Sequence, residues 1–203
     1  MNRFAFNILA GLTALMFFSA PITAQAQTQD NSPSQNSIDQ NNDNSYSPDE
    51  VLSAGHEFFG GVSRDLALAV ESLFSKYGQP NGYILGEEGG GAIIGGLRYG
   101  EGTLHTRNSG EHKIYWQGPS IGWDFGADAG RTMMLIYNMN DTEEMYRRYI
   151  GVSGSAYLIG GLGITILSNS NVVAAPIRAG VGARLGISAG YLKFTHRPTW
   201  NPF

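Results

Sequence analysis

The sequence predicts a β-rich α+β domain, in which two N-terminal helices and one inserted short helix accompany a small antiparallel β-barrel or strongly curved sheet. Three observations lead to this fold class. Helical spacing of apolar residues is confined to the region before Gly82 and to one insertion near residue 140, and a period of two prevails elsewhere. The expected strands follow one another through short turns, which suits antiparallel pairing. Glycine makes up 28 of the 203 residues, about twice its usual share.

The first 26 residues have the pattern of a secretory signal peptide. A basic start at Arg3 is followed by an apolar run over residues 4–18, and Ala24-Gln25-Ala26 supplies small residues for cleavage after Ala26. An uncleaved anchor helix is the alternative, and the short apolar run disfavours it. No later stretch approaches the ~20 apolar residues of a membrane span, so the cleaved chain is not expected to be membrane-spanning.

The absence of cysteine limits the chemistry that the protein can perform and the compartments that it is expected to occupy. It excludes disulfides, thiolate metal sites and a lipidated N-terminal cysteine, and in an exported chain it favours a bacterial periplasm. The formal net charge is −4 and becomes one unit more negative when Arg3 leaves with the signal, which argues against a nucleic-acid partner. Residues 27–46 are almost all Gln, Asn, Ser and Asp, so we expect a disordered linker before a folded domain over residues 47–203.

Two helices are expected at the start of the folded domain. Ser47 is a helix cap with Pro48 at the first helical position and Glu50 three residues after the cap, and this helix runs to about Phe59. A second helix follows in "VSRDLALAVESLFSKYG" (62–78), where apolar residues recur at helical spacing. Its apolar stripe is interpreted as core-facing. A membrane-surface helix is the alternative, although the expected rim of Lys and Arg is missing.

The strands are expected from Gly82 onward. Residues 120–129 and 177–191 alternate between an apolar face and a face of glycine, serine and charge, whereas "TMMLIYN" (132–138) is apolar on both faces and should lie centrally. "NDTEEMYRRYIG" (140–151) reads as the inserted short helix. So many glycines on one strand face indicate tight curvature, or a group packed flat against that face.

Two catalytic motifs overlap in "GPSIGWDFG" (118–126), and neither fits its surroundings. The G-x-S-x-G elbow of serine hydrolases needs a helix after its serine, but Ser120 is followed by an alternating strand and only by His196 as a later base. The kinase tripeptide at Asp124 lacks the other kinase elements. The four histidines lack zinc-binding spacing, and the glycine clusters match no phosphate-binding or dinucleotide motif, so no metal and no cofactor is expected.

Glu87 and Glu88 are adjacent acidic residues in an expected strand. Because neighbouring strand residues face opposite sides, they are not expected to share an acid–base site. The sequence therefore predicts that the protein is not an enzyme.

Long strings in the expected strands resemble a known family. "GGGAIIGGLRYGEG", "KIYWQGPSIGWDFGADAG" and "APIRAGVGARLGISAGYLKF" closely resemble the EipA, or envelope integrity protein A, family of alphaproteobacterial periplasmic proteins. "FGGVSRDLALAVESLF" and the closing "TWNPF" fit the same family, so the resemblance covers about residues 50–203. More distantly, the order of elements is similar to the SYLF lipid-binding domain. These resemblances imply a small antiparallel barrel with helices against it, a role in envelope integrity, no established catalytic residues, and phospholipid as a ligand.

The polar, glycine-rich strand face that carries Arg178 and Arg184 is the candidate ligand-binding site. The two arginines are six residues apart, and the bare glycine backbone between them would admit the anionic headgroup of a phospholipid or lipopolysaccharide. Solvent exposure, or inter-strand ion pairing with Glu or Asp, is the alternative role of these arginines. Trp116 and Trp123 are expected in the core, with the lining of a ligand pocket as the alternative.

The sequence as a whole predicts a non-enzymatic periplasmic protein that supports cell-envelope integrity by binding lipid or another envelope component, with envelope proteins as further partners. One alternative is an integral outer-membrane barrel, suggested by the terminal aromatic Phe203. The last ten residues disfavour it, since they contain two prolines and do not alternate. The other alternative is a serine hydrolase that uses Ser120.

Overall fold

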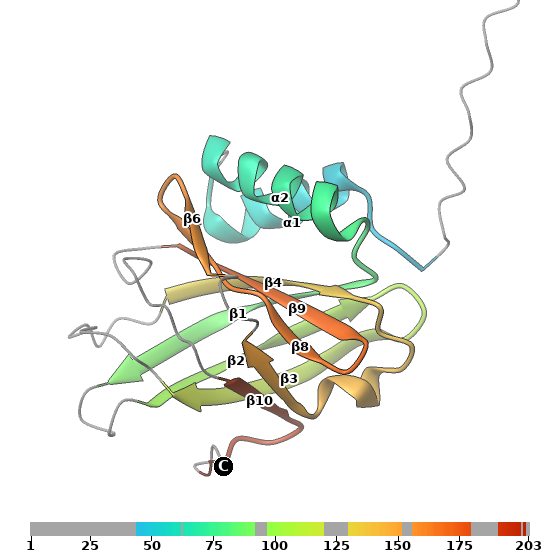
Figure 1. The fold of residues 1–203 in the computed structure, drawn as a ribbon, viewed down its shortest axis with the longest axis vertical. Coiled ribbons are helices and arrows are strands. Elements are labelled where there is room, and N and C mark those ends of the chain that lie inside the picture. Colours follow the sequence, from blue (N-terminus) through green and yellow to red (C-terminus); the bar gives the residue numbers. More distant parts are fainter. Residues whose placement is uncertain are drawn as a thin grey trace, which may run out of the picture. The chain divides into compact units, whose positions relative to one another are not determined.

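The computed structural model describes residues 44–61, 63–91, 97–119, 130–151, 156–179, 191–199 and 201. They form two α-helices, α1 (Pro48–Phe59) and α2 (Arg64–Tyr77), a short 3-10 helix η2 (Thr142–Met145), and ten strands of one antiparallel sheet (Figure 1). The strands are β1 (Gly82–Gly91), β2 (Leu97–Thr106), β3 (Gly110–Pro119), β4 (Gly130–Tyr137), β5 (Arg148–Gly151), β6 (Tyr157–Ile159), β7 (Leu162–Ile164), β8 (Leu167–Asn169), β9 (Val172–Ala179) and β10 (Tyr191–Thr195). Within this described part, neither helix has the length and apolar character that crossing a bilayer requires.

Eight of the strands close into a barrel, which confirms the predicted fold class. The ring runs β4-β1-β2-β3-β10-β5-β8-β9, and β9 returns to β4 through the pairing of Val173–Arg178 with Thr132–Tyr137. Every neighbouring pair in the ring is antiparallel. Closure leaves no free edge in the ring, so each strand has hydrogen-bonding partners on both sides.

The hairpin of β6 and β7 lies outside this ring. The first residues of β9 pair with β8, but its last three, Ile177–Ala179, pair with β7 instead. The hairpin is also held by α2, because Asp65 accepts a hydrogen bond from the backbone N–H of Gly161. β6 pairs with β7 alone among the described strands, and its Leu158 is 51% exposed.

The helix boundaries agree with those predicted from the sequence. Ser47 and Glu50 form a reciprocal capping box at the start of α1, and Gly60 ends that helix with a positive φ of 85°. α2 begins after the Ser63 cap and ends before Gly78. The inserted helix is shorter than the predicted 140–151 segment. It is one 3-10 turn. The last four residues of the predicted segment form β5 instead, because they pair with β10 and β8.

The two helices cover the outer face of β4 and β9 (Figure 1). β4 is apolar on both faces, as predicted, with Met133 and Leu135 against the helices and Met134 and Ile136 inside the barrel. The apolar stripe of α2 faces this outer layer, which supports its interpretation as a core-facing stripe. The helix residues buried there are Val51, Leu66, Ala69, Val70 and Leu73.

Side chains of the chain itself fill the interior of the barrel along its described strands. One buried cluster combines residues of the inner wall with residues from η2 and its flanks. Its members are Ile84, Leu104, Ile114, Trp116, Met134, Ile136, Met139, Met145, Tyr149, Leu167, Val172, Ala174, Leu192 and Phe194. The barrel therefore has two hydrophobic layers, one inside the ring and one between the ring and the helices.

Candidate functional site

Three directly paired residues form a row across the inner wall of the barrel: Glu88 on β1, Gly100 on β2 and Trp116 on β3. A Cβ atom on Gly100 would lie 2.1 Å from Cε2 of Trp116 and 2.4 Å from its Nε1, far inside van der Waals contact. The indole therefore lies over the bare backbone of Gly100 and extends across β2 toward Glu88. Glycine is required at this position because any side chain would displace the ring.

A second glycine pair, Gly86 and Gly102, adjoins this row on β1 and β2. A Cβ atom on Gly86 would lie 2.2 Å from the carbonyl oxygen of Glu101 and 2.7 Å from Cη2 of Trp116. The sequence left two explanations open for a glycine-rich strand face, tight curvature and a group packed flat against it. Both apply here, and the packed group is the chain's own Trp116.

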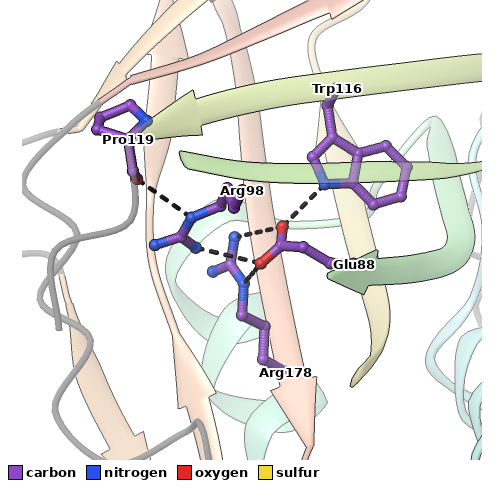
Figure 2. A network of polar contacts seen from close by, with 5 residues as sticks. All are labelled: Glu88, Arg98, Trp116, Pro119 and Arg178. Atoms are coloured by element: carbon purple, nitrogen blue, oxygen red, sulfur yellow. Dashed lines mark hydrogen bonds and ion pairs between the residues drawn. The ribbon is translucent and has the colours of Figure 1, made fainter. Parts of the chain in front are cut away.

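Glu88 lies at the centre of a polar network that we call the Glu88 cluster, which consists of Glu88, Arg98, Trp116 and Arg178 (Figure 2). Oε1 of Glu88 accepts hydrogen bonds from Nη1 of Arg98 at 3.2 Å and from Nε of Arg178 at 2.9 Å. Oε2 accepts from Nε1 of Trp116 at 2.8 Å and from Nη2 of Arg178 at 3.3 Å. Nε of Arg98 also donates to the carbonyl oxygen of Pro119 at 3.2 Å.

The four members of the cluster come from four strands, β1, β2, β3 and β9. They meet at one end of the barrel, near the last residues of β1, β3 and β9 and the first residue pairs of β2. Arg178 reaches Glu88 across β4, because Thr132 pairs with Arg178 on one side and with Gly86 on the other. The cluster therefore ties together strands that are not all neighbours in the sheet.

The cluster is largely buried, with side-chain exposures of 10% for Glu88, 10% for Arg98 and 17% for Arg178. Burial alone would raise the pKa of the Glu88 carboxyl. The charges of Arg178 and Arg98, together with the hydrogen bonds from Arg178 and Trp116, outweigh burial and lower that pKa to about 2. Glu88 is therefore a carboxylate throughout the physiological pH range, with four N–H donors from the described residues directed at it.

This arrangement is suited to holding charge in a fixed place and poorly suited to moving protons. A general acid or base works best when its pKa lies near the operating pH, and Glu88 lies far below it. Within the described residues, no group of three or more His, Asp or Glu is placed to hold a metal ion. The geometry of the cluster therefore offers hydrogen-bond donors and charge.

Two of the four sequence-predicted site residues, Arg178 and Trp116, meet in this cluster. Arg178 makes the inter-strand ion pair with Glu that was one of its two alternative roles. Trp116 is fully buried, as expected of a core residue. Arg184 and Trp123 lie outside the described residues, as do Ser120 of the hydrolase alternative and the whole 120–129 segment.

Sequence reasoning missed Glu88 and Arg98. Glu88 was considered only as a partner of Glu87, and the two do face opposite sides of β1. The same alternation places Glu88 on the face of Gly86, so a lone carboxylate within a glycine-rich face was the signal available in the sequence. The expectation of a single covered, apolar strand face was also incomplete on β9. Ile177 packs against the helix layer, and Arg178 points into the barrel.

The fold and the cluster define a class of protein: a small closed antiparallel barrel, covered by two helices on one side, that contains an ionic cluster inside one end. A crystal structure of an uncharacterised, β-barrel-like protein from Brucella abortus is similar, with 57% sequence identity and a TM-score of 0.74 over 79% of this chain and 99% of that one. The chain belongs to the envelope integrity protein A family, which matches residues 44–203.

The family match confirms the resemblance found in the sequence, and it implies a role in the integrity of the cell envelope. Among curated proteins, none matches this chain.

Proposed function

We propose that this protein supports envelope integrity from the periplasm, without catalysing a reaction, by binding lipid or another envelope component at the end of the barrel that holds the Glu88 cluster. The observation that carries the proposal is the cluster itself. It holds two arginines, Arg98 and Arg178, at the inner wall of the barrel, with a carboxylate between them that does not titrate near neutral pH.

The packing of the barrel favours binding of a ligand at one end of the barrel over enclosure of a ligand in its interior. The inner wall is filled by buried side chains such as Trp116 and Phe194, so a ligand inside the ring would have to displace the core. The cluster lies where the strands end, and Arg178 keeps 17% of its side chain exposed. An envelope component that carries anionic groups would find hydrogen-bond donors at this end.

The outer wall of the barrel disfavours the outer-membrane alternative. Glu101 on β2 and Lys113 on β3 form an ion pair on that wall, with side-chain exposures of 61% and 52%. In a membrane barrel the outer face contacts lipid, where a buried lysine at the bilayer midplane costs about 2–4 kcal/mol. A wall that carries such charges is more stable in contact with water than in contact with lipid.

The proposal is tested by isolating the full chain, expressed with its own N-terminus, from the periplasmic fraction without detergent. Organic extraction and mass spectrometry then identify whatever co-purifies. We expect a stoichiometric lipid or lipopolysaccharide fragment that is lost from a Glu88→Gln/Arg178→Gln double variant. The matched control is Glu101→Gln/Lys113→Gln, which removes the same two charges from the outer wall and should keep the component.

Three outcomes would count against the proposal. Absence of any stoichiometric component would remove the binding role, and equal amounts in both double variants would place binding away from the Glu88 cluster. Recovery of the chain from the cytoplasmic fraction alone would contradict the periplasmic location.

A further inference from the structure

The guanidinium of Arg178 has hydrogen-bonding capacity that the Glu88 cluster does not use. An arginine carries five N–H donors in a planar fork. Nε and Nη2 of Arg178 are directed at the two oxygens of Glu88. Nη1 has no acceptor among the described residues, and Figure 2 shows it pointing away from the carboxylate. Among the residues that the structure describes, one edge of this guanidinium is thus occupied and a second edge has no acceptor.

The cluster holds that second edge in a fixed orientation. Two hydrogen bonds to one carboxylate define the plane of the guanidinium, and Glu88 is itself held by Trp116 and Arg98. An arginine that is already ordered loses little side-chain entropy when it binds a further group.

The charges around this edge select the chemistry of its partner. Arg98 and Arg178 both donate to the same oxygen of Glu88, so two guanidiniums lie side by side at the end of the barrel. Nη1 can only donate, so its partner must accept hydrogen bonds, and a nearby second cation favours an acceptor with negative charge. Phosphate and carboxylate oxygens match a planar guanidinium edge through paired hydrogen bonds.

We infer that the Nη1 edge of Arg178 is an anion site for a phosphate-type oxyanion, in which Glu88 and Arg98 act as positioning residues. The inference rests on the proposed function, because it names the chemical group through which the envelope component would be held. A lipid headgroup and free phosphate share this chemistry, and the experiment separates them.

The test uses the full chain labelled with nitrogen-15, because Nε1–H of Trp116 and Nε–H of Arg178 give side-chain NMR signals inside the cluster. Inorganic phosphate is titrated at constant ionic strength against chloride. We expect saturable shifts of both signals with phosphate and none with chloride. Arg178→Lys keeps the charge opposite Glu88 but loses the planar fork, so phosphate should bind about tenfold more weakly or worse.

Arg107→Lys is the matched control for that substitution. Arg107 is also ion-paired, to Glu50, but it follows the far end of β2, so its replacement should leave the phosphate titration unchanged. If Arg178→Lys does not fold, Arg178→Gln replaces it, because Glu88 then keeps Arg98 as its ion partner and Trp116 as a hydrogen-bond donor. Co-sedimentation with phosphatidylglycerol vesicles then identifies the source. Binding to vesicles that is lost in the variant indicates a headgroup, and phosphate binding without vesicle binding indicates a free anion.

The failure of this inference differs from the failure of the proposed function. An absence of saturable shifts, or equal phosphate binding by Arg178→Lys, overturns the anion site even if a lipid co-purifies with the chain. Saturable phosphate binding supports the anion site even if no envelope component is recovered, and that combination counts against the proposed function alone.

Discussion

Replacing Glu88 by glutamine tests the central physical claim, that the ionised carboxylate stabilises the barrel. Glutamine keeps the size of the side chain and one acceptor oxygen but leaves Arg98 and Arg178 without their anion. The pKa of Glu88 falls from its ordinary 4.5 to about 2 in the folded chain. Since each pKa unit corresponds to about 1.4 kcal/mol, the carboxylate stabilises the folded state by about 3 kcal/mol.

The burial of the Glu88–Arg178 ion pair predicts a loss of stability of the same size. Removing one partner of a buried ion pair typically costs about 3–5 kcal/mol, because the remaining charge stays buried without compensation. For a domain of this size, about 1 kcal/mol lowers the melting temperature by roughly 2–4 °C, so we expect a drop of roughly 6–12 °C at pH 7.

The pH dependence gives this prediction a second signature. A carboxyl whose pKa is lowered on folding stabilises the protein above its unfolded pKa and loses that contribution as the pH falls toward its folded pKa. The difference between wild type and Glu88→Gln should therefore be constant from pH 8 to 5 and should shrink between pH 4.5 and 2. Thermal unfolding by circular dichroism at constant ionic strength measures it.

A stabilising role of the Glu88 carboxylate would be refuted by a Glu88→Gln variant that unfolds within about 1 kcal/mol of wild type at pH 7, or by a difference that persists unchanged to pH 2. Glu101→Gln is the matched control, because Glu101 is also paired but is 61% exposed. Screening by solvent makes such a pair worth about 0–1 kcal/mol, so the control should be nearly silent.

Two further substitutions test the packing and the capping. Gly100→Ala should destabilise the barrel by about 1–3 kcal/mol and shift the fluorescence of Trp116, because the added methyl group meets the indole. Gly89→Ala, with nothing within 4 Å of its Cβ, should cost nothing, and an equal loss in both variants would contradict the flat packing. Ser47→Ala should cost about 1 kcal/mol in urea unfolding by removing the cap of α1, whereas Ser53→Ala, exposed on the same helix, should be neutral.

Local signals in the sequence predicted the helices and the barrel. The caps at Ser47 and Gly60 define α1 through neighbouring residues alone, and alternation with short turns is enough to indicate antiparallel strands. The apolar character of both faces of β4 likewise predicted a strand covered on each side. The family resemblance rested on long strings and needed no three-dimensional information.

The composition of the candidate site could not be predicted in the same way. A period of two divides β9 into two faces, but it does not say which face the helices cover, so the inward position of Arg178 was not determined. Its partner Glu88 lies 90 residues away in sequence, and the pair depends on the register of β1, β4 and β9. Register across three strands is a property of the closed sheet and is not encoded in any one segment.

The change of partner along β9 has a consequence for local stability. The β6–β7 hairpin is joined to the ring by three residue pairs with β9, to α2 by the contact between Asp65 and Gly161, and to the helix layer by the buried side chains of Leu162 and Ile164. The eight-strand ring closes without these strands, so the hairpin can open locally by exposing Leu162 and Ile164, at a free-energy cost below that of global unfolding. The hairpin can thus unfold locally while the barrel stays folded, and its amide protons should exchange with solvent well before those of β4.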